Sequence, residues 1–321
     1  MKKIKLLSLL LLIGFYASSQ TIAKFSISFS SINSETAIPA SINLDDFTFV
    51  HDTTITLWQL SGKTKTQIPF QVKQGSTRTL HWLINNSVNE KKLSYVLEKG
   101  SKANTSGINA TSNNGSLTFN AANQNLLRYQ FQTVYPPAGQ DTNYKRSGFI
   151  HPLWTPHGQV LTNIQPKDHY HHYGIWNPWT HTVFEKDTID FWNIKGHKGT
   201  VRFAKFISQT SGPVFSESEL LHEHVVFKKD GTEKIALNEL QTIRVYNPQG
   251  EKNYYIVDFT SQLSCATQSP FLIVAYRYAG FGWRATDEWT KDNCEVFTSE
   301  GTNRKNTDGI KARWLAAQGT L

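Results

Sequence analysis

Alternation of apolar and polar residues along most of the chain limits the folds that it can adopt. The segments KFSISFS (24–30), TLHWLI (79–84), TVRFAKFIS (200–208) and YYIVDFTSQLS (254–264) alternate with a period of two, which is the spacing of side chains on one face of a β-strand. Clusters of Asn, Gly and Ser between such segments, as in SNNGS (112–116), favour turns. Long amphipathic helical patterns are nearly absent. We therefore expect an all-β protein whose antiparallel sheets stack as a β-sandwich.

A polar run at residues 99–116 predicts a linker between two domains. This run is rich in Gly, Asn and Ser and shows no apolar periodicity, as is common where few contacts cross a boundary. Residues 20–98 before it carry about five short strand patterns, enough for a small N-terminal β domain. Residues 117–321 after it are expected to form a larger β-sandwich, which contains nearly all of the unusual chemistry of the chain.

The first nineteen residues have the composition of an export signal. Lysines give a positive start, residues 6–12 form a short apolar run, and Ala17 and Ser19 are the small residues that precede a cleavage site. No later stretch approaches the roughly 18 consecutive apolar residues of a membrane span. We therefore expect a signal peptide over residues 1–19, a periplasmic or secreted protein, and no membrane insertion after the signal is removed.

The charge of the chain argues against a nucleic-acid partner. Removal of residues 1–19 takes away three lysines and lowers the formal net charge from +8 to +5. The remaining positive charge is not gathered in one run, whereas nucleic-acid binding normally needs a clustered basic face. The sequence gives no indication of the oligomeric state.

The two cysteines, Cys265 and Cys294, leave two alternatives open. In an oxidising compartment they could form one disulfide. They could equally be two separate buried thiols, since free cysteine is among the most buried residue types.

One window of the chain concentrates chemistry-bearing side chains. Seven of the eleven histidines and four of the nine tryptophans fall between residues 151 and 197, and the densest part is KDHYHHYGIWNPWTH (167–181). Any single member could be a core or loop residue, which is the commoner fate of tryptophan. That explanation is harder to apply to the whole window at once, so the clustering predicts a functional site.

A metal site is one interpretation of this window. On a strand, His169 and His171 would project from the same face while His172 would point away. Such a pair can supply two ligands to zinc, copper or iron, and His222 and His224 repeat the spacing. A divalent metal at His169 and His171 is the one cofactor that the sequence suggests, although the pattern names no third ligand.

Acid–base chemistry on a polar ring is the second interpretation. Histidine exchanges protons near neutral pH, so we expect His169 and His171 to transfer protons. Arg146 or Arg284 would hold a carboxylate or a pair of hydroxyls. Arg284 could instead form a surface ion pair that contributes little.

Aromatic and acidic residues would complete such a site. Trp176 and Trp179 have flat apolar faces suited to stacking on a sugar ring, although the NPW sequence between them could be only a turn. Glu239 and Asp258 lie in strand-like segments and could supply a carboxylate partner.

Four segments together resemble a known family. They are YPPAGQDTNYKRSGFIHPLWTPHGQVLTN (135–163), KDHYHHYGIW (167–176), DFWN (190–193) and YAGFGWRA (278–285). They are similar to the uncharacterised exported family described as methane oxygenase PmoA-like, over roughly residues 120–314. The preceding residues resemble the small β domain that often accompanies that family.

The resemblance implies a fold, a substrate class and a set of site residues. It implies a carbohydrate-active β-sandwich similar to the galactose mutarotase type, in which His151, His169, His171, His172 and Arg284 belong to the site. The membrane monooxygenase subunit itself is excluded, because this chain has no transmembrane segment. Where the family often has arginine after the double histidine, this chain has a tyrosine, which removes a charge from that position.

The resemblance also suggests that further strands would follow the tryptophan near the C-terminal end. We therefore expect either a shortened chain or a missing segment there.

Three functions remain open from the sequence. The leading one is an exported carbohydrate-active enzyme of the hydrolase, lyase or epimerase type, with His169, His171, His151 and Arg284 as catalytic residues. Its substrate would be a glycoside or an oxidised sugar, bound by four further residues, which are His172, Trp176, Trp179 and Arg146. The alternatives are a metal-dependent protein and a non-catalytic glycan-binding module. A serine nucleophile elbow, a P-loop and a dinucleotide-binding glycine motif are all absent from the sequence.

Overall fold

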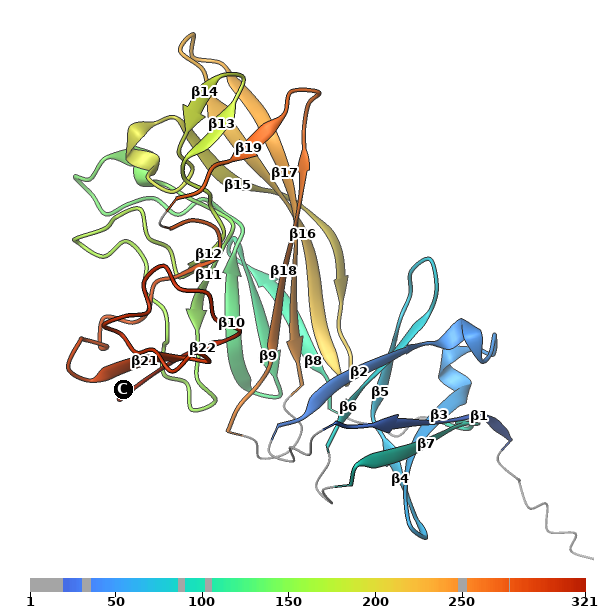
Figure 1. The fold of residues 1–321 in the computed structure, drawn as a ribbon. Coiled ribbons are helices and arrows are strands. Elements are labelled where there is room, and N and C mark those ends of the chain that lie inside the picture. Colours follow the sequence, from blue (N-terminus) through green and yellow to red (C-terminus); the bar gives the residue numbers. More distant parts are fainter. Residues whose placement is uncertain (1–19, 31–35, 86–89, 102–105, 248–252, 277) are drawn as a thin grey trace, which may run out of the picture. The chain divides into compact units, whose positions relative to one another are not determined.

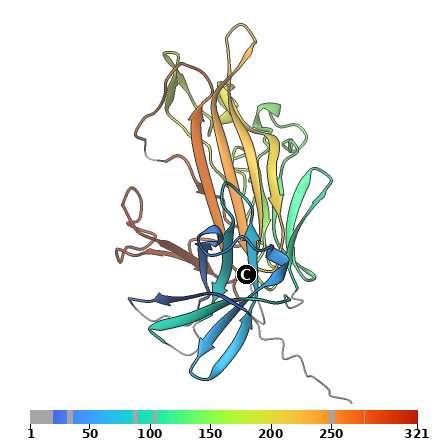
Figure 2. The same cartoon turned by 90° about the vertical axis from the view of Figure 1, so that its right-hand side faces the viewer.

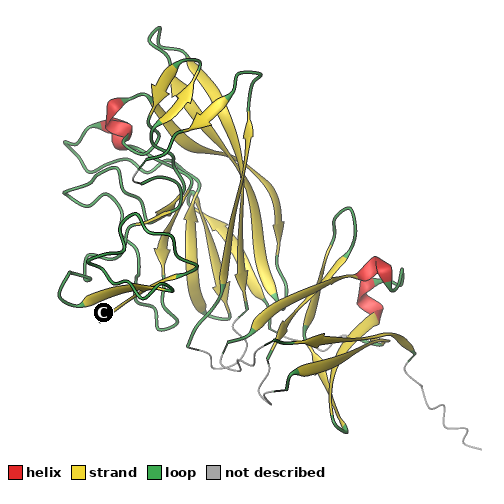
Figure 3. Cartoon of the chain, in the orientation of Figure 1, coloured by secondary structure: helices red, strands yellow, loops and turns green. Residues whose placement is uncertain are grey.

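Strands form almost all of the regular structure. The computed structural model describes residues 20–30, 36–85, 90–101, 106–247, 253–276 and 278–321. In these residues every helical segment is a single short 3-10 turn, and no α-helix is present (Figure 3). All strand pairings between the named strands are antiparallel within the same residues, so the all-β prediction is confirmed. The expected signal peptide lies outside the described residues. No helix in the described part has the length and apolar character needed to cross a membrane.

The chain divides into two compact units, Met1–Asn104 and Thr105–Leu321. This division falls inside the predicted linker, but part of that prediction is wrong. Ile108–Asn113 form a strand, β8, which pairs with the next strand. The run is polar, yet Ile108 is fully buried in the core of the second unit and anchors the strand there.

The N-terminal unit contains two antiparallel sheets (Figure 1). The four-stranded sheet has the order β1 (Thr21–Ser28), β7 (Lys92–Lys99), β3 (Ile55–Ser61) and β4 (Thr64–Ile68), and the three-stranded sheet has the order β2 (Ile38–Asn43), β6 (Thr79–Ile84) and β5 (Phe70–Lys73). Apolar side chains from both sheets form one buried core that includes Leu57, Trp82 and Tyr95. Burial follows the sequence alternation in β1, where half-buried and exposed residues mostly alternate, but not in β6, where five successive residues are buried.

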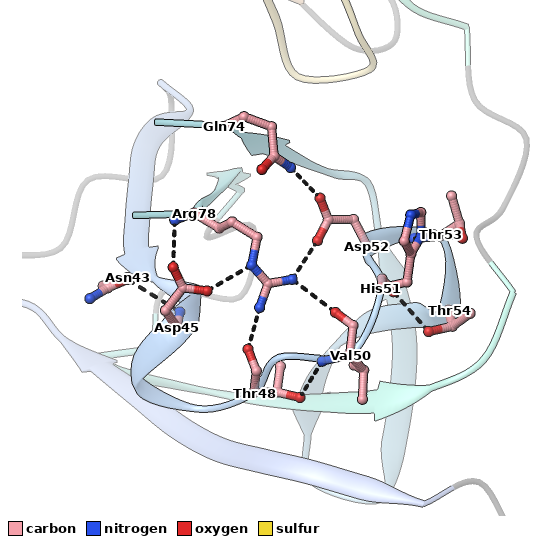
Figure 4. Close-up of polar contacts among 10 residues, drawn as sticks. All are labelled: Asn43, Asp45, Thr48, Val50, His51, Asp52, Thr53, Thr54, Gln74 and Arg78. Atoms are coloured by element: carbon pink, nitrogen blue, oxygen red, sulfur yellow. Dashed lines mark hydrogen bonds and ion pairs between the residues drawn. The ribbon is translucent and has the colours of Figure 1, made fainter. Parts of the chain in front are cut away.

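Arg78 fixes the loop of the N-terminal unit that carries the 3-10 turns η1 (Leu44–Asp46) and η2 (Asp52–Thr54) (Figure 4). Its Nε donates to Asp45 at 2.7 Å, and its Nη1 donates to Asp52 and to the Val50 carbonyl, each at 2.8 Å. Its Nη2 donates to the carbonyl of Thr48. A single planar guanidinium thus satisfies acceptors along the whole loop, as only arginine can.

Two larger sheets pack face to face in the C-terminal unit (Figure 2). One has the order β20 (Gly282–Trp283), β12 (Ile175–Trp176), β11 (Phe149–Leu153), β10 (Gln124–Gln130), β9 (Ser116–Ala121) and β8, and the other has the order β15 (Gly199–Thr210), β16 (Phe215–Phe227), β17 (Glu233–Tyr246) and β18 (Val257–Cys265). Their inner faces share a core that includes Phe119, Leu220 and Ile243. These two sheets form the β-sandwich that the alternation predicted.

Smaller sheets complete this unit. A three-stranded sheet has the order β14 (Asp187–Ile189), β13 (Thr182–Phe184) and β19 (Phe271–Ile273), and a two-stranded sheet joins β21 (Cys294–Thr298) to β22 (Leu315–Gly319). The three-stranded sheet packs on the end of β15, β16 and β17 through its own small core, which includes Phe184, Phe191 and Val226.

Loops cover the outer face of the six-stranded sheet, and these loops carry the histidine-rich window. Ile150 on β11 points into the sandwich core, whereas its neighbour Phe149 packs with Tyr173 and Ile194 from the loops. Two 3-10 turns, η3 (Thr142–Tyr144) and η4 (Ile194–Gly196), lie against each other in this layer. The two neighbouring side chains thus lie on opposite faces of the sheet. Ile150 faces the main core, and Phe149 faces the loops that carry the candidate site.

Both cysteines are free thiols. Cys265 is exposed at the end of β18, while Cys294 is buried at the start of β21. The structure therefore contains no disulfide between them, and only one of the two thiols is buried.

Candidate functional site

The histidine-rich segment forms a closed loop. Ile164 and Tyr173 form a bridge at its two ends, and the Gln165 amide donates to the carbonyl of His172 at 2.8 Å. Within the loop, the His172 amide donates to the His169 carbonyl at 3.0 Å, which makes a turn. The segment is therefore a turn, and not the strand on which the spacing argument for His169 and His171 depended. Backbone hydrogen bonds at its two ends close the loop.

The loop brings three imidazoles into contact. The ring centroids of His169 and His172 are 4.6 Å apart with an interplanar angle of 15°. Those of His171 and His172 are 4.5 Å apart, and those of His169 and His171 are 5.5 Å apart. His172 was expected to point away from its neighbours, and that expectation is wrong because the turn rotates it back toward them. The three rings form one cluster, called here the histidine cluster.

An acidic residue connects the histidine cluster to Arg284. Asp168 lies 2.7 Å from Nδ1 of His169 through one carboxylate oxygen, and Nη2 of Arg284 lies 3.4 Å from the other. Arg284 also lies 3.8 Å from Asp287. These pairs are partly exposed, and the arginine contacts are long, so they stabilise the fold little. Their geometry leaves the guanidinium able to bind a second anion.

Tryptophans form the wall behind the histidine cluster. The His172 ring centroid lies 5.5 Å from that of Trp176 and 6.0 Å from that of Trp192, and the two indoles are 4.8 Å apart. Trp176 is only 3 % exposed, so it supports His172 and offers no open face for a sugar ring.

The prediction of Trp179 as a stacking surface also needs correction. A Cβ built on Gly280 would meet its indole at 3.1 Å, and its Nε1 is buried. It is packed under the backbone of the glycine-rich segment. Trp192 was not singled out by the sequence reasoning, although it stands in the DFWN motif, and it is the more exposed indole beside the histidine cluster.

The histidine cluster borders an open cleft with a volume of about 730 Å³. The cleft is lined by polar and aromatic side chains from two loops, namely Tyr144, Lys167, Asp168, His169, Tyr170, His171, Asp190, Asn193, Lys195 and Lys198, together with Gly196. Its size suits a small ligand such as a sugar unit. We call it the histidine cleft.

The environment of the histidine cluster keeps two of its rings neutral. Burial, with the neighbouring His169 and Arg146, lowers the pKa of His171 to about 4. Burial, with the adjacent imidazoles, lowers the pKa of His172 to about 3. The hydrogen bond with His169 lowers the pKa of Asp168, so this carboxylate stays ionised. Both imidazoles are therefore unprotonated at neutral pH, so their ring nitrogens can accept hydrogen bonds beside an ionised carboxylate.

Two predicted site residues lie elsewhere. The imidazole of His151 on β11 contacts the Thr162 hydroxyl at 2.9 Å, and burial, followed by the charge of Arg128, lowers its pKa to about 4. Arg146 is 3 % exposed and donates to the Phe191 carbonyl at 2.7 Å. The contacts of His151 are therefore with a different set of residues from the histidine cluster, and Arg146 lines a second cleft.

The sandwich interior contains a second group of histidines. His222 lies 2.5 Å from the Tyr129 hydroxyl, and His224 lies 3.1 Å from Glu239. The same carboxylate accepts hydrogen bonds from Asn177 at 2.8 Å and from Ser261 at 2.7 Å. Burial would raise the pKa of Glu239, but hydrogen bonds from the two histidines outweigh it and hold that pKa well below its usual value. Glu239 is thus the partner of the buried histidines, while Asp258 accepts from the Tyr246 hydroxyl at 2.8 Å.

The metal prediction lacks a third ligand. In the part of the chain that the structure describes, no group of three or more His, Cys, Asp or Glu side chains is arranged to hold a metal ion. The rings of His169 and His171 meet edge-on with their centroids 5.5 Å apart, and the third member of their group is the ring of His172, which stacks on His169. A metal at these two histidines stays a prediction.

Comparison with known proteins places the larger unit in a family. No curated protein matches the chain. A family model described as a family of unknown function, DUF6807, matches residues 116–321, which include the histidine cluster, both clefts and the buried histidine pair. The chain therefore belongs to the DUF6807 family.

Proposed function

We propose that the protein is an exported carbohydrate-active enzyme that uses histidine for proton transfer on a glycoside or an oxidised sugar. One observation supports this most strongly: three imidazoles lie in mutual contact at the edge of an open cleft, beside an ionised carboxylate and an arginine. Histidines packed only for stability would more often be separated and individually satisfied in the core. The resemblance to the PmoA-like family and to galactose mutarotase-type sandwiches favours the same substrate class.

The residues in and beside the histidine cleft have distinct roles in this proposal. His169 and His171 line the cleft and would transfer protons with the substrate, while His172 stacks on His169 and meets His171 edge-on. Asp168 would orient His169, as an acidic partner commonly does for a catalytic imidazole. Arg284 would bind a carboxylate or carbonyl oxygen of the sugar, a task for which its planar donor fork is suited.

The acidic residues favour proton abstraction over hydrolysis by a carboxylate pair. Hydrolysis of that type needs one carboxylic acid with a raised pKa. Asp168 has a lowered pKa, and Asp190 accepts hydrogen bonds from the amides of Trp192 and Asn193 at 2.8 and 2.9 Å. A neutral histidine that removes a proton from the carbon next to a carboxylate or carbonyl group leads to elimination or epimerisation. We therefore propose the lyase or epimerase type within the broader class.

A panel of plant and algal glycans and oxidised sugars tests this function. The purified mature protein is incubated with each substrate, and new double bonds, reducing ends and inverted stereocentres are followed by absorbance and NMR. We expect a product that is lost in His169→Ala and His171→Ala variants. His157→Ala is the matched control, because His157 lies exposed in the turn after β11 and does not line the cleft. Absence of any product, or equal turnover in all three variants, would overturn the proposal.

Export can be tested separately. Expression of the full chain in a bacterial host, followed by fractionation and N-terminal sequencing, should give a periplasmic or secreted product that lacks residues 1–19. Retention of Lys2 and Lys3 in the mature product would contradict export through this signal.

A further inference from the structure

A second cleft lies next to the histidine cleft, with a volume of about 470 Å³. Its charged lining is mostly basic and consists of Lys145, Arg146, Arg202, Lys228, Lys229 and Glu233. The apolar part of the lining includes Phe227 from the end of β16 and Ile194 from η4. We call it the basic cleft.

Only some of these cations are neutralised. Arg202 pairs with Glu233 at 2.8 Å and with Glu223 at 3.0 Å, and Lys228 pairs with Glu185 at 2.9 Å. Among the described residues, neither Lys145 nor Lys229 has a carboxylate within ion-pair distance. The basic cleft therefore keeps a positive surplus facing the solvent.

Arg146 is a buried cation in the wall of the basic cleft. The residue is 3 % exposed, and within the described residues the one hydrogen bond of its side chain is to the Phe191 carbonyl, while its Nε is buried without a partner. No ion pair to a described carboxylate compensates it. Burying a cation in this way is costly unless an anion or further acceptors approach it. An unsatisfied arginine at the wall of a basic cleft is the arrangement that an oxyanion would complete.

The two clefts share a wall. In the first segment of that wall, Tyr144 lines the histidine cleft and the next residue, Lys145, lines the basic cleft. In the second segment, Lys195 and Lys198 line the histidine cleft while His197 lines the basic cleft. The turns η3 and η4 that form this wall contact each other. Lysines therefore line both clefts, on the two sides of this shared wall.

We propose that the basic cleft binds an oxyanion group of a polyanionic glycan whose neighbouring sugar unit occupies the histidine cleft. The inference rests on the proposed function for the identity of the ligand as a glycan. The shared chemistry is an anionic oxygen group, which is a carboxylate in uronate polymers and a sulfate ester in sulfated polymers. Either would accept hydrogen bonds from the buried guanidinium and be attracted by the free lysines.

Binding is measured by titration calorimetry or affinity electrophoresis on the mature protein, at low and high salt. The probes are a polyuronate, a sulfated galactan and a neutral glucan. The charge-reversed variant is Lys145→Glu with Lys229→Glu, because both side chains are exposed enough to leave folding intact. The matched control is Lys291→Glu with Lys311→Glu, which makes the same charge change at exposed positions that line neither cleft. Arg146→Gln is added, with its fold checked by circular dichroism.

We expect one polyanion to bind more tightly than the neutral glucan and to weaken as salt rises. Charge reversal at Lys145 and Lys229 should raise its dissociation constant by about tenfold or more, the effect of losing two favourable surface charges, while the control changes it little. The probe that responds identifies the group as carboxylate or sulfate. Equal binding of polyanions and the neutral glucan, or equal effects of both double variants, would overturn the inference.

The outcome is separable from that of the proposed function. Salt-dependent binding through Lys145 and Lys229 without turnover would refute the catalytic proposal and leave the basic cleft as an anion site. Turnover that is the same in wild type and in the charge-reversed variant at every substrate concentration would retain the enzyme and reject the basic cleft.

Discussion

His224 and Glu239 face each other inside the sandwich, on neighbouring strands, with the His224 Nε2 3.1 Å from a Glu239 carboxylate oxygen. Both side chains are fully buried. Burial lowers the pKa of His224, so a neutral imidazole donates to an ionised carboxylate. The buried negative charge of Glu239 is tolerated because several donors hydrogen-bond to it. Removal of that charge should be costly, because these donors would lose their acceptor.

Glu239→Gln should lower the free energy of unfolding by about 2–4 kcal/mol, because an amide cannot accept from all the donors that now meet at this position. Urea denaturation measures the change. Glu223→Gln is the control, since Glu223 lies on β16 between the two buried histidines but pairs outward with Arg202. It should cost less than about 1 kcal/mol. Similar losses in both variants would mean that the buried carboxylate has no special role.

Asp168→Asn should reduce turnover while the fold is kept. The asparagine would still contact His169 but would lose the charge that holds the imidazole and Arg284 together. We expect kcat to fall about tenfold to a hundredfold, as for other residues that orient a catalytic histidine. Steady-state kinetics on the substrate found in the glycan panel, with Asp287→Asn as the control, provides the measurement. An unchanged kcat would show that Asp168 does not orient the proton-transfer group.

Stability should fall as the pH drops from about 6.5 toward 4. His151 and His171 have folded-state pKa values of about 4, and His172 has one of about 3. Their unfolded values are near 6.5. In this window the unfolded chain therefore binds more protons than the folded one, which favours unfolding.

Melting temperatures at several pH values within this window measure the effect. Replacing His151 by asparagine should make the decrease with acid smaller, because one of the contributing groups is gone. The exposed-site variant His157→Asn should leave the decrease unchanged. A melting temperature that is constant between these pH values would contradict the assigned pKa shifts.

One thiol should react under native conditions. Cys265 is exposed and Cys294 is buried, and thiol reagents need access to the sulfur. Titration with a chromogenic disulfide should therefore release one equivalent from the folded protein and a second after denaturation. Cys265→Ser should abolish the first equivalent. No reaction even after denaturation would indicate a disulfide, in conflict with the structure.

Arg78→Lys should loosen the loop that Arg78 fixes in the N-terminal unit. A lysine retains the charge, but it cannot reach Asp45, Asp52 and two carbonyls at once. Hydrogen exchange of amides in the η1–η2 segment should become faster than in wild type. Lys63→Ala, in the turn between β3 and β4, should leave that exchange unchanged. Equal protection in the two proteins would show that the loop is held by other contacts.

The sequence predicted the strands well because alternation is a local property. The run at 200–208 lies within β15, and the run at 254–264 overlaps β18. Each strand buries one face against a sheet, so its pattern records its environment. The polar strand β8 was missed because Ile108 is its one fully buried side chain, and a single apolar residue makes no pattern.

The clustering of histidines and tryptophans pointed to the candidate site, but the spacing argument gave the wrong geometry for it. His169 and His171 do meet, but they do so on a turn, whose direction is set by the contact between Ile164 and Tyr173. The spacing of residues in the sequence does not predict that contact. The burial of Trp176 and Arg146 likewise depends on loops that return from distant parts of the chain, such as the segment that ends in Trp192. Residue type shows what a side chain can do, and only the tertiary fold shows whether it has space to do it.

The strands β16 and β17, with 13 and 14 residues, are about twice as long as β10, with 7. At roughly 3.3 Å per residue they extend past the six-stranded sheet. The small sheet of β13, β14 and β19 lies at the projecting end (Figure 1), and the core that includes Phe184 and Phe191 joins it to these strands. Phe191 also accepts the hydrogen bond of Arg146. This end of the C-terminal unit is consequently anchored by fewer buried apolar side chains than the main sandwich. Fluctuations that release this end would reshape both clefts while the main sandwich stays folded.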